Sequence, residues 1–421
     1  MATATKIAGP SIDVHGVTDP GNPIKENQDT FFTIQFKDHV AMGVFDGHGK
    51  ACGLLASSTA RDFFHAKFSI NDTYAELEAH PEQTMRKLFH ECHLAIKEAL
   101  RQRYLAARNN VQDRKGSFLV IKPTLLQKSI LVQGGTTASI AIILHGIKLI
   151  CANVGDSSAL LSSATAKLQT SSWKSLQEID MLRVHNNQGP TFSHPGDLDA
   201  EQVKPPLLVI LSGDHSPEAL VEFHSVAKSR PQTNHPHLPE LMFLYDGIIP
   251  GSAKKLTLRE RHQLLERRPV FQVQNNDIQP VGEGCYFKNV RQEWASLCCT
   301  PTKAKYHESL AFTRSLGDFY MHYYGITHEP DVIEVNLDKL NHGNDPPTFN
   351  LVLASDGIWD CWKYGEAAAF VLESLTHHDA TSTAKLFMKK NKELSRGVFG
   401  SQVDNMTAII CSIRYHSEDN Q

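Results

Sequence analysis

Four aspartates stand at the edges of apolar runs that are typical of strands. Asp46, Asp156 and Asp356 follow such runs in VFDGHG, ANVGDS and ASDGIWD, and Asp404 precedes one in VDNMTAII. A strand fixes the position of a carboxylate at its end, and a neighbouring glycine lets backbone carbonyls approach an ion. Hard divalent cations such as Mg²⁺ prefer oxygen ligands of this kind. The four motifs together therefore indicate one acidic metal centre.

An Asp-Gly pair alone gives weak support for a metal site, because it is also a common turn pair. The segment Tyr245-Asp246-Gly247 has the same appearance but no companion motif, and we interpret it as a turn. The prediction of a metal centre therefore depends on several motifs taken jointly.

The elements that would position these residues can be read from the periodicity of apolar residues. Residues 40–45 form an apolar run, and steps of three and four residues predict a helix over 82–108. Two apolar runs, 136–144 and 147–154, are separated by His145-Gly146, which predicts a hairpin.

The C-terminal part of the chain shows the same two kinds of pattern. We expect strands over 351–354 and 406–413, and amphipathic helices over 364–375 and 382–394. Strands and helices do not alternate regularly along the chain. This order disfavours a doubly wound parallel sheet and favours an α+β fold with segregated layers.

The middle of the chain, about 164–304, differs from both ends in composition. It is rich in Pro, His, Asn and Gly, and contains a charged, helix-like stretch over 259–268. A structureless loop of this length would be unusual in a compact domain. We therefore expect one domain over 1–421 with a flap-like insertion at 164–304, and flexible ends at about 1–10 and 415–421.

Composition excludes several classes of protein. There are 42 Lys plus Arg against 46 Asp plus Glu, a net charge of −4, so binding to nucleic acid through bulk charge is not expected. No apolar run is long enough to span a membrane. The eight cysteines are sparse and form no C-x-x-C pair, which indicates reduced thiols in the cytoplasm or nucleus. We expect a monomer that binds neither nucleic acid nor membrane.

The motifs occur in an order that resembles the protein phosphatase 2C family, the metal-dependent Ser/Thr phosphatases. The matching segments are KENQD (25–29), VFDGHG (44–49), GGTTA (134–138), ANVGDS (152–157), GDHSP (213–217), AFTRSLGD (311–318), EPDV (329–332), ASDGIWD (354–360) and DNMTAI (404–409). Nine motifs in family order are very improbable as a coincidence.

The resemblance implies a fold and a metal site. The fold would be an αββα sandwich of two antiparallel sheets flanked by helix pairs. Two Mg²⁺ or Mn²⁺ ions would lie at one end, with Asp46 bridging both, the Gly47 carbonyl reaching one, and Asp356 and Asp404 holding the other. Asp156 is implied as a ligand of a weaker third ion.

The resemblance also implies catalytic roles. His48 would be the general acid that protonates the leaving Ser or Thr oxygen, and Asp29 would orient metal-bound water. An imidazole is a suitable proton donor near neutral pH. An isolated turn histidine without chemistry is the alternative for His48. The substrate would be a phosphoprotein.

The sequence departs from the family pattern at three positions near the motifs. Gln28 replaces a common Glu, Ile24 replaces a phosphate-binding Arg, and Ser158 replaces the Arg of GDSR. Lys25 could bind phosphate as a point charge, or it could be a solvated surface lysine.

These departures leave two further hypotheses open. One is a catalytically weak or inactive binding module that keeps the fold, and the other is a hydrolase of small phosphate esters. The insertion could select substrates or bind a regulatory partner.

Overall fold

Two antiparallel sheets pack face to face at the centre of the protein. The computed structural model describes residues 7–115, 117–122, 128–166, 173–174, 207–229, 239–247, 267–274, 277–340 and 346–417. The first sheet has the order β1 (Ile7–Asp19), β23 (Met406–Ser417), β22 (Thr348–Ala354), β11 (Ser158–Ser163) and β13 (Leu207–Ile210). The second has the order β12 (Trp173–Lys174), β21 (Asp331–Asn336), β10 (Lys148–Val154), β9 (Ala138–Leu144), β3 (His39–Phe45) and β2 (Thr30–Gln35).

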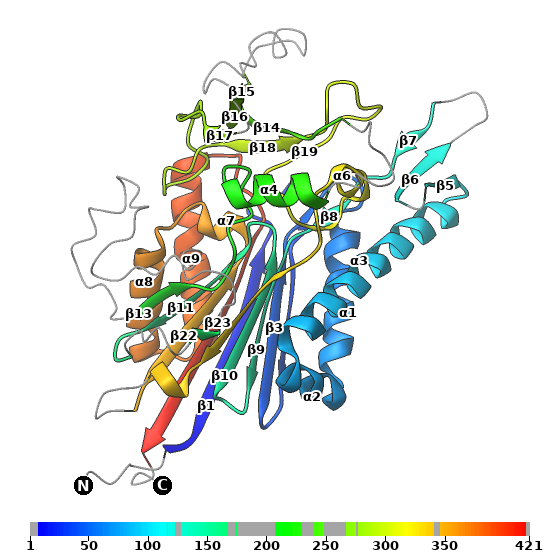
Figure 1. Ribbon diagram of the computed structural model, residues 1–421. Helices are drawn as coiled ribbons and strands as arrows, with labels where there is room; N and C mark the ends of the chain where they lie inside the picture. The colour runs from blue at the N-terminus through cyan, green and yellow to red at the C-terminus, as the bar shows by residue number, and fades with distance from the viewer. Residues whose placement is uncertain are drawn as a thin grey trace.

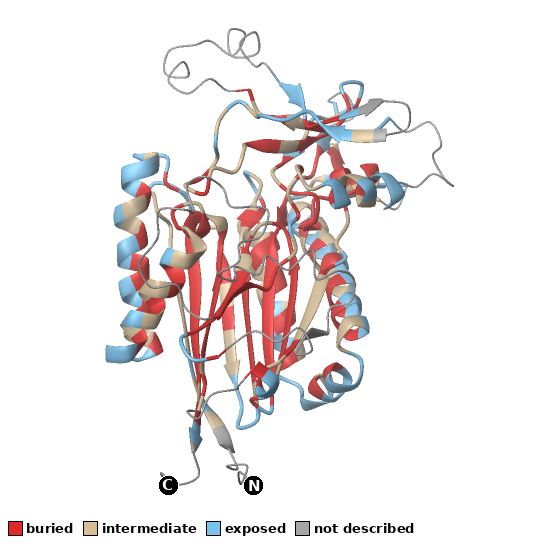
Figure 2. Cartoon of the chain, turned by 60° about the vertical axis from the view of Figure 1, so that its left-hand side comes forward, coloured by how far each residue is buried: buried red, intermediate tan, exposed pale blue. Residues whose placement is uncertain are grey.

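The central strands are buried on both faces, which explains their continuous apolar sequences. In β3, Met42 and Val44 pack between the two sheets, whereas Ala41 and Phe45 contact the helical layer on the other side. Side chains alternate between the two faces of a strand, so both faces of β3 must be apolar. Figure 2 shows buried residues along the strands and exposed residues on the outer sides of the helices.

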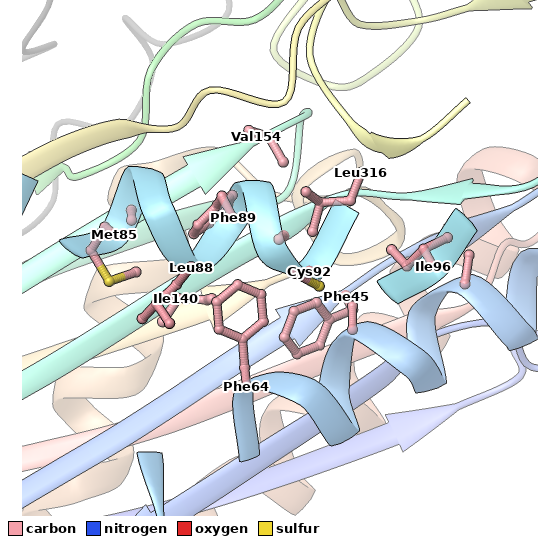
Figure 3. Close-up of a cluster of buried hydrophobic side chains, with 14 of the residues drawn as sticks. Phe45, Phe64, Met85, Leu88, Phe89, Cys92, Ile96, Ile140, Val154 and Leu316 are labelled. Carbon is pink, nitrogen blue, oxygen red and sulfur yellow. The ribbon is translucent and has the colours of Figure 1, made fainter. Parts of the chain in front are cut away.

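Helices cover the outer face of each sheet (Figure 1). The second sheet is covered by α1 (Gly53–Phe68) and α3 (Pro81–Ala106), with α2 (Asn71–Ala79) beside them. Figure 3 shows Phe64 of α1 and Phe89 of α3 packing together with Phe45 of β3. The first sheet is covered by α8 (Tyr364–His377) and α9 (Ala380–Phe399). The predicted α+β, αββα sandwich is thus confirmed.

The elements expected from periodicity agree with the structure, and two features explain why. His145 and Gly146 both have positive φ, 51° and 66°, as a tight hairpin turn between β9 and β10 requires. Asp379 caps α9 by accepting a hydrogen bond from the Ser382 amide at 2.7 Å. The helix therefore begins slightly before its first strongly periodic residues.

Strand β1 was not expected from the sequence. It pairs with β23 from Asp19↔Met406 to Ile7↔Ser417, and its register shifts between Ala8 and Ser11, next to Pro10. As an edge strand, β1 can accommodate a proline that an inner strand would exclude. The pairing of Ile7 with Ser417 falls within the two ranges for which flexible ends were predicted.

Most described parts of the predicted insertion cover one end of the sandwich (Figure 1), but β12 and β13, which also fall within it, are edge strands of the two central sheets. The covering parts form helix α4 (Leu220–Ser229), a two-stranded sheet β16-β17 and a sheet of order β15-β14-β18-β19, whose last strand lies beyond the predicted range. The bounds of these strands are β14 (Met242–Tyr245), β15 (Arg268–Pro269), β16 (Phe271–Gln274), β17 (Asp277–Pro280), β18 (Ser296–Cys299) and β19 (Ser309–Leu310). The predicted charged helix over 259–268 falls outside the described residues, except for its last two positions.

Short elements complete the same end of the molecule. They are β4 (Gly47–His48), β5 (Asn110–Arg114), β6 (Phe118–Lys122), β7 (Ile130–Leu131), β8 (Gly135–Thr136), β20 (Leu316–Gly317), α6 (Phe319–Tyr324) and α7 (Asp356–Trp359). A 3₁₀ turn at Asp338–Leu340 lies at the opposite end, where the Leu337 amide donates to the Ile147 carbonyl. Among the described helices, none has the length and apolar character needed to cross a bilayer.

Candidate functional site

The predicted aspartates meet at the end of the sandwich that the insertion covers. Asp46 follows β3 and Asp156 follows β10, two strands on either side of β9. Asp356 follows β22, and Asp404 lies two residues before its neighbour β23. Neighbouring antiparallel strands bring the end of one beside the start of the next. The topology therefore explains how residues 358 positions apart reach one site.

The electrostatics of the group show how closely its members lie. Burial raises the pKa of Asp46 well above its usual range, and the charges of Asp29, Asp356 and Asp156 raise it further. Burial likewise raises the pKa of Asp356, with contributions from Asp156, Asp360 and Asp404. Like charges held together away from water favour protonation unless a cation neutralises them.

The donor set fits divalent cations. Oδ1 of Asp29 and Oδ1 of Asp156 are buried and have no hydrogen-bond partner among the described residues. A buried carboxylate oxygen without a partner is costly, and a hard cation would satisfy it. Asp404 lies at the solvent-exposed side of the group, where its Oδ1 is 3.7 Å from Lys25 Nζ.

The backbone around Asp46 and Gly47 is held by the GGTTA segment. The Asp46 carbonyl accepts hydrogen bonds from Thr136 Oγ1 and from the Thr137 amide, both at 2.9 Å, and the Asp46 amide donates to Thr137 Oγ1. A Cβ atom at Gly47 would lie 2.5 Å from the Gly53 carbonyl oxygen. Only glycine fits this position, which explains the Asp-Gly pair.

Asp29 is oriented from the opposite sheet. Ser355 Oγ donates to Asp29 Oδ2 at 2.8 Å and accepts from the Thr407 amide at 3.0 Å. Burial raises the pKa of Asp29 to about 6, while the hydrogen bond from Ser355 lowers it in part. Sequence reasoning assigned no role to Ser355, although it lies inside the ASDG motif.

His48 lies beside the aspartates and forms an ion pair with Asp318. The distance from His48 Nε2 to Asp318 Oδ2 is 2.7 Å, and the Asp318 side chain is only 6% exposed. Burial lowers the pKa of His48, but the charge and hydrogen bond of Asp318 raise it more, so the net shift is upward. The ring of Phe312 contacts His48 edge-on at 5.2 Å. Asp318 was part of a matched motif, but its role was missed.

The other residues that the sequence analysis discussed lie at three places in the structure. Lys25 lies near the acidic centre through its contact with Asp404, whereas Ile24 is 93% exposed. Ser158 lies on β11, and its carbonyl accepts from the Trp359 indole. Asp246 lies 3.8 Å from Arg267 and 3.3 Å from the Tyr286 hydroxyl, in the sheet of the insertion.

Asp360 is a further acidic residue at the same end, and the sequence analysis assigned it no role. Burial raises its pKa to about 6, Lys288 and Arg291 lower it, and Asp156 raises it. Its position four residues after Asp356 places both on one face of the short helix α7 and the turn that follows. The motif ASDGIWD contained this signal.

Three further histidines, His93, His322 and His328, form a separate group near Asp318. We refer to them as the histidine cluster. Their ring nitrogens lie within 4.8 Å of one another, a spacing that a metal ion could use. However, the rings of His93 and His328 are stacked at 4.3 Å with planes 13° apart, and His93 Nδ1 accepts from the Gly317 amide. Imidazole lone pairs lie in the ring plane, so stacked rings do not converge on one ion. We interpret the cluster as neutral packed histidines.

Comparison with known families agrees with this architecture. The sequence model of the family described as Protein phosphatase 2C matches residues 52–177 and 296–395, which together make up more than half of the chain. The chain therefore belongs to the protein phosphatase 2C family.

Individual relatives are similar over limited regions. Protein phosphatase 1L of Bos taurus is 30% identical over 115 residues, 27% of this chain and 28% of that protein. Protein phosphatase 2C homolog 2 of Schizosaccharomyces pombe is 29% identical over 109 residues, 25% of this chain and 29% of that protein. These matches span less than a third of either relative.

A solved structure extends the likeness to the whole fold. The serine-threonine phosphatase 2C from Toxoplasma gondii superimposes with a TM-score of 0.53 and 13% identity, covering 99% of this chain and 100% of that one. At this identity the comparison concerns the fold alone.

Proposed function

We propose that this protein is a metal-dependent protein Ser/Thr phosphatase that hydrolyses phosphoserine and phosphothreonine by direct attack of water. The observation that carries the proposal is the group of the buried Asp29 and the half-buried Asp46, Asp156 and Asp356, beside an ion-paired His48. Asp29 and Asp156 each have a carboxylate oxygen without a hydrogen-bond partner among the described residues. Acidic residues that share a buried site and a perturbed histidine next to them are typical of catalytic centres.

Asp46, the Gly47 carbonyl, Asp356 and Asp404 would hold two divalent cations, Mg²⁺ or Mn²⁺. When bound, such cations lower the pKa of a water nucleophile and neutralise charge on the phosphoryl oxygens. Asp29, held by Ser355, would orient the attacking water by accepting a hydrogen bond from it.

His48 donates a proton to the leaving serine or threonine oxygen. An alkoxide is a poor leaving group, so its departure requires a general acid that is charged near neutral pH. Asp318 keeps His48 charged and accepts a hydrogen bond from its Nε2. For this proton to reach the leaving oxygen of the substrate, the imidazole ring must turn, or Nε2 must share the proton between Asp318 and the substrate. We assign His48 the catalytic role and Asp318 the positioning role.

The substrate of this centre is a phosphoprotein that lies in the groove next to His48. The groove has a volume of about 1040 Å³ and continues from His48 along β19 to Arg267 on the insertion. Lys25, at the rim of the acidic centre, is the candidate side chain for binding the phosphate. A regulatory partner that binds the insertion belongs to the same proposal. We place the protein in a reducing compartment, the cytoplasm or nucleus, because its eight cysteines are sparse and form no C-x-x-C pair.

The experiment that tests the proposal is phosphopeptide hydrolysis with added Mn²⁺, with Asp46→Asn as the variant. Loss of the central carboxylate removes the charge that holds both ions, so turnover falls by several orders of magnitude. Asp62→Asn is the matched control, because it makes the same change at an exposed position of α1, where Asp62 pairs with Arg61, and is expected to keep wild-type turnover. A wild type without Mn²⁺-dependent turnover favours the inactive binding module, and preference for small phosphate esters favours the small-molecule hydrolase.

A further inference from the structure

The groove beside His48 presents positive charge to a ligand. Among the described residues that line it, the Lys, Arg, Asp and Glu side chains are Lys50, Arg267, Glu308 and Asp318. Lys50 and Arg267 are exposed, whereas Asp318 is buried in its ion pair with His48. Glu308 is half-buried, and its Oε2 lies away from solvent. A peptide in this groove therefore meets two exposed cations and no exposed carboxylate of the described lining.

Arg267 reaches the groove from the insertion. It directly precedes β15, and its Nε lies 3.8 Å from Oδ1 of Asp246, the residue that follows β14. Its Nη1 lies 3.9 Å from Sγ of Cys299 on β18, which also lines the groove. The Tyr286 hydroxyl donates to Oδ2 of Asp246 at 3.3 Å. Because β15, β14 and β18 are neighbours in this order, the side chain of Arg267 extends across the sheet toward the groove.

The guanidinium of Arg267 keeps donors for a ligand. The contact with Asp246 is longer than a hydrogen bond, and a thiol is a weak acceptor. Among the described residues, Nη2 has no hydrogen-bond partner, and the side chain is 37% exposed. A guanidinium in this state binds a carboxylate through two parallel hydrogen bonds, and its position is already set by Asp246 on the Nε side.

We propose that Arg267 is a specificity-determining residue that selects phosphopeptides with an aspartate or glutamate near the phosphorylated residue. The inference rests on the proposed function, because it presumes that the phosphorylated residue lies at His48. The substrate carboxylate binds the Nη nitrogens of Arg267, and Lys50 adds positive charge in the same groove. A lysine or arginine at that position of the substrate is disfavoured by repulsion between like charges.

The test is steady-state hydrolysis of phosphoserine peptides by the full chain with Mn²⁺. A single glutamate is placed at each position on both sides of the phosphoserine in a peptide of alanine and glycine, and a second series carries lysine instead. In wild type, glutamate at one or more positions is expected to raise kcat/KM about three- to tenfold over alanine, chiefly through a lower KM. Lysine at the same position is expected to lower kcat/KM.

Variants of Arg267 assign this preference to its charge. In Arg267→Gln, the gain from glutamate is expected to disappear. In Arg267→Glu, lysine at the same position is expected to become the favoured residue, and a general loss of structure would not produce such a reversal. Arg268→Gln is the matched control, because it makes the same change at the next residue, which is not part of the groove lining; it is expected to keep the wild-type preference.

Two results would overturn the inference while leaving Mn²⁺-dependent hydrolysis intact. One is equal kcat/KM for the glutamate and lysine peptides at every position in wild type, and the other is a gain from glutamate that survives in Arg267→Gln. If the Arg267 variants fold poorly, the wild-type comparison of glutamate with lysine decides alone. A wild type that hydrolyses none of the phosphopeptides contradicts the proposed function and this inference together.

Discussion

The ion pair between His48 and Asp318 predicts a variant whose defect depends on the leaving group. Asp318→Asn preserves the size of the side chain, and Asn tolerates the positive φ of 45° at this position. The substitution removes the carboxylate charge that raises the pKa of His48. Burial, which lowers this pKa, is then no longer opposed, so His48 loses its proton at lower pH.

The expected magnitude follows from the contact itself. A hydrogen bond to a charged group contributes about 1.5–3 kcal/mol when it is buried, as this one is at 2.7 Å. Because about 1.4 kcal/mol corresponds to a factor of ten, the protonated fraction of His48 above its pKa falls by about ten- to a hundredfold. Turnover of a phosphoserine peptide falls by the same factor at pH values above the wild-type pKa of His48, and the alkaline limb of its pH profile moves to lower pH.

The assay compares two substrates over a range of pH. Serine alkoxide needs a proton to depart, whereas p-nitrophenolate is stable without one, so hydrolysis of p-nitrophenyl phosphate is expected to change little in Asp318→Asn. In a His48→Gln background, Asp318→Asn is expected to have no further effect on the phosphopeptide, because the two residues act as one unit. Equal losses on both substrates, or an alkaline limb that does not move, would refute the assignment of His48 as general acid.

Further predictions concern stability and the close approach of Gly357 to the segment before β23. In the histidine cluster, burial and neighbouring rings lower the pKa of His322 to about 3 and that of His328 to about 4. Below pH 6.5 the unfolded chain therefore binds more protons than the folded chain. As the pH falls from 6.5 to 5, the free energy of unfolding is expected to decrease by about 2 kcal/mol for each histidine that stays neutral in the folded protein. Urea titrations at both pH values measure this decrease, and a stability that does not change with pH contradicts it. Gly357→Ala would place Cβ 1.9 Å from the Asn405 carbonyl oxygen, so it is expected to destabilise by about 1–3 kcal/mol and weaken Mn²⁺ binding, measured by thermal unfolding and calorimetry. Gly397→Ala, with no atom within 4 Å in helix α9, is the control and is expected to stabilise by about 0.5–1 kcal/mol; equal stability of the two variants speaks against the close approach.

The sequence predicted those parts of the fold in which local pattern and tertiary burial agree. The central strands are apolar throughout because both faces are buried, and His145-Gly146 supplies the backbone conformation that the hairpin requires. Strand β1 was missed because its Gly and Pro residues resemble a loop, and only its pairing with β23 stabilises it as an edge strand.

The residues of the candidate site likewise include some that the sequence could predict and some that it could not. The aspartates could be named from the sequence because each stands next to an apolar strand with its own motif. The pairing of His48 with Asp318 joins positions 270 residues apart, and no local signal indicates it. Contacts of this kind depend on the folded chain.

Anomalous diffraction from crystals grown with Mn²⁺ shows whether the aspartates at the covered end of the sandwich hold two divalent cations. We expect two manganese peaks, both in contact with the Asp46 carboxylate, one of them also contacting Asp356 and Asp404. Absence of manganese from Asp46, or manganese bound elsewhere while these carboxylates contact only protein atoms, would contradict this expectation.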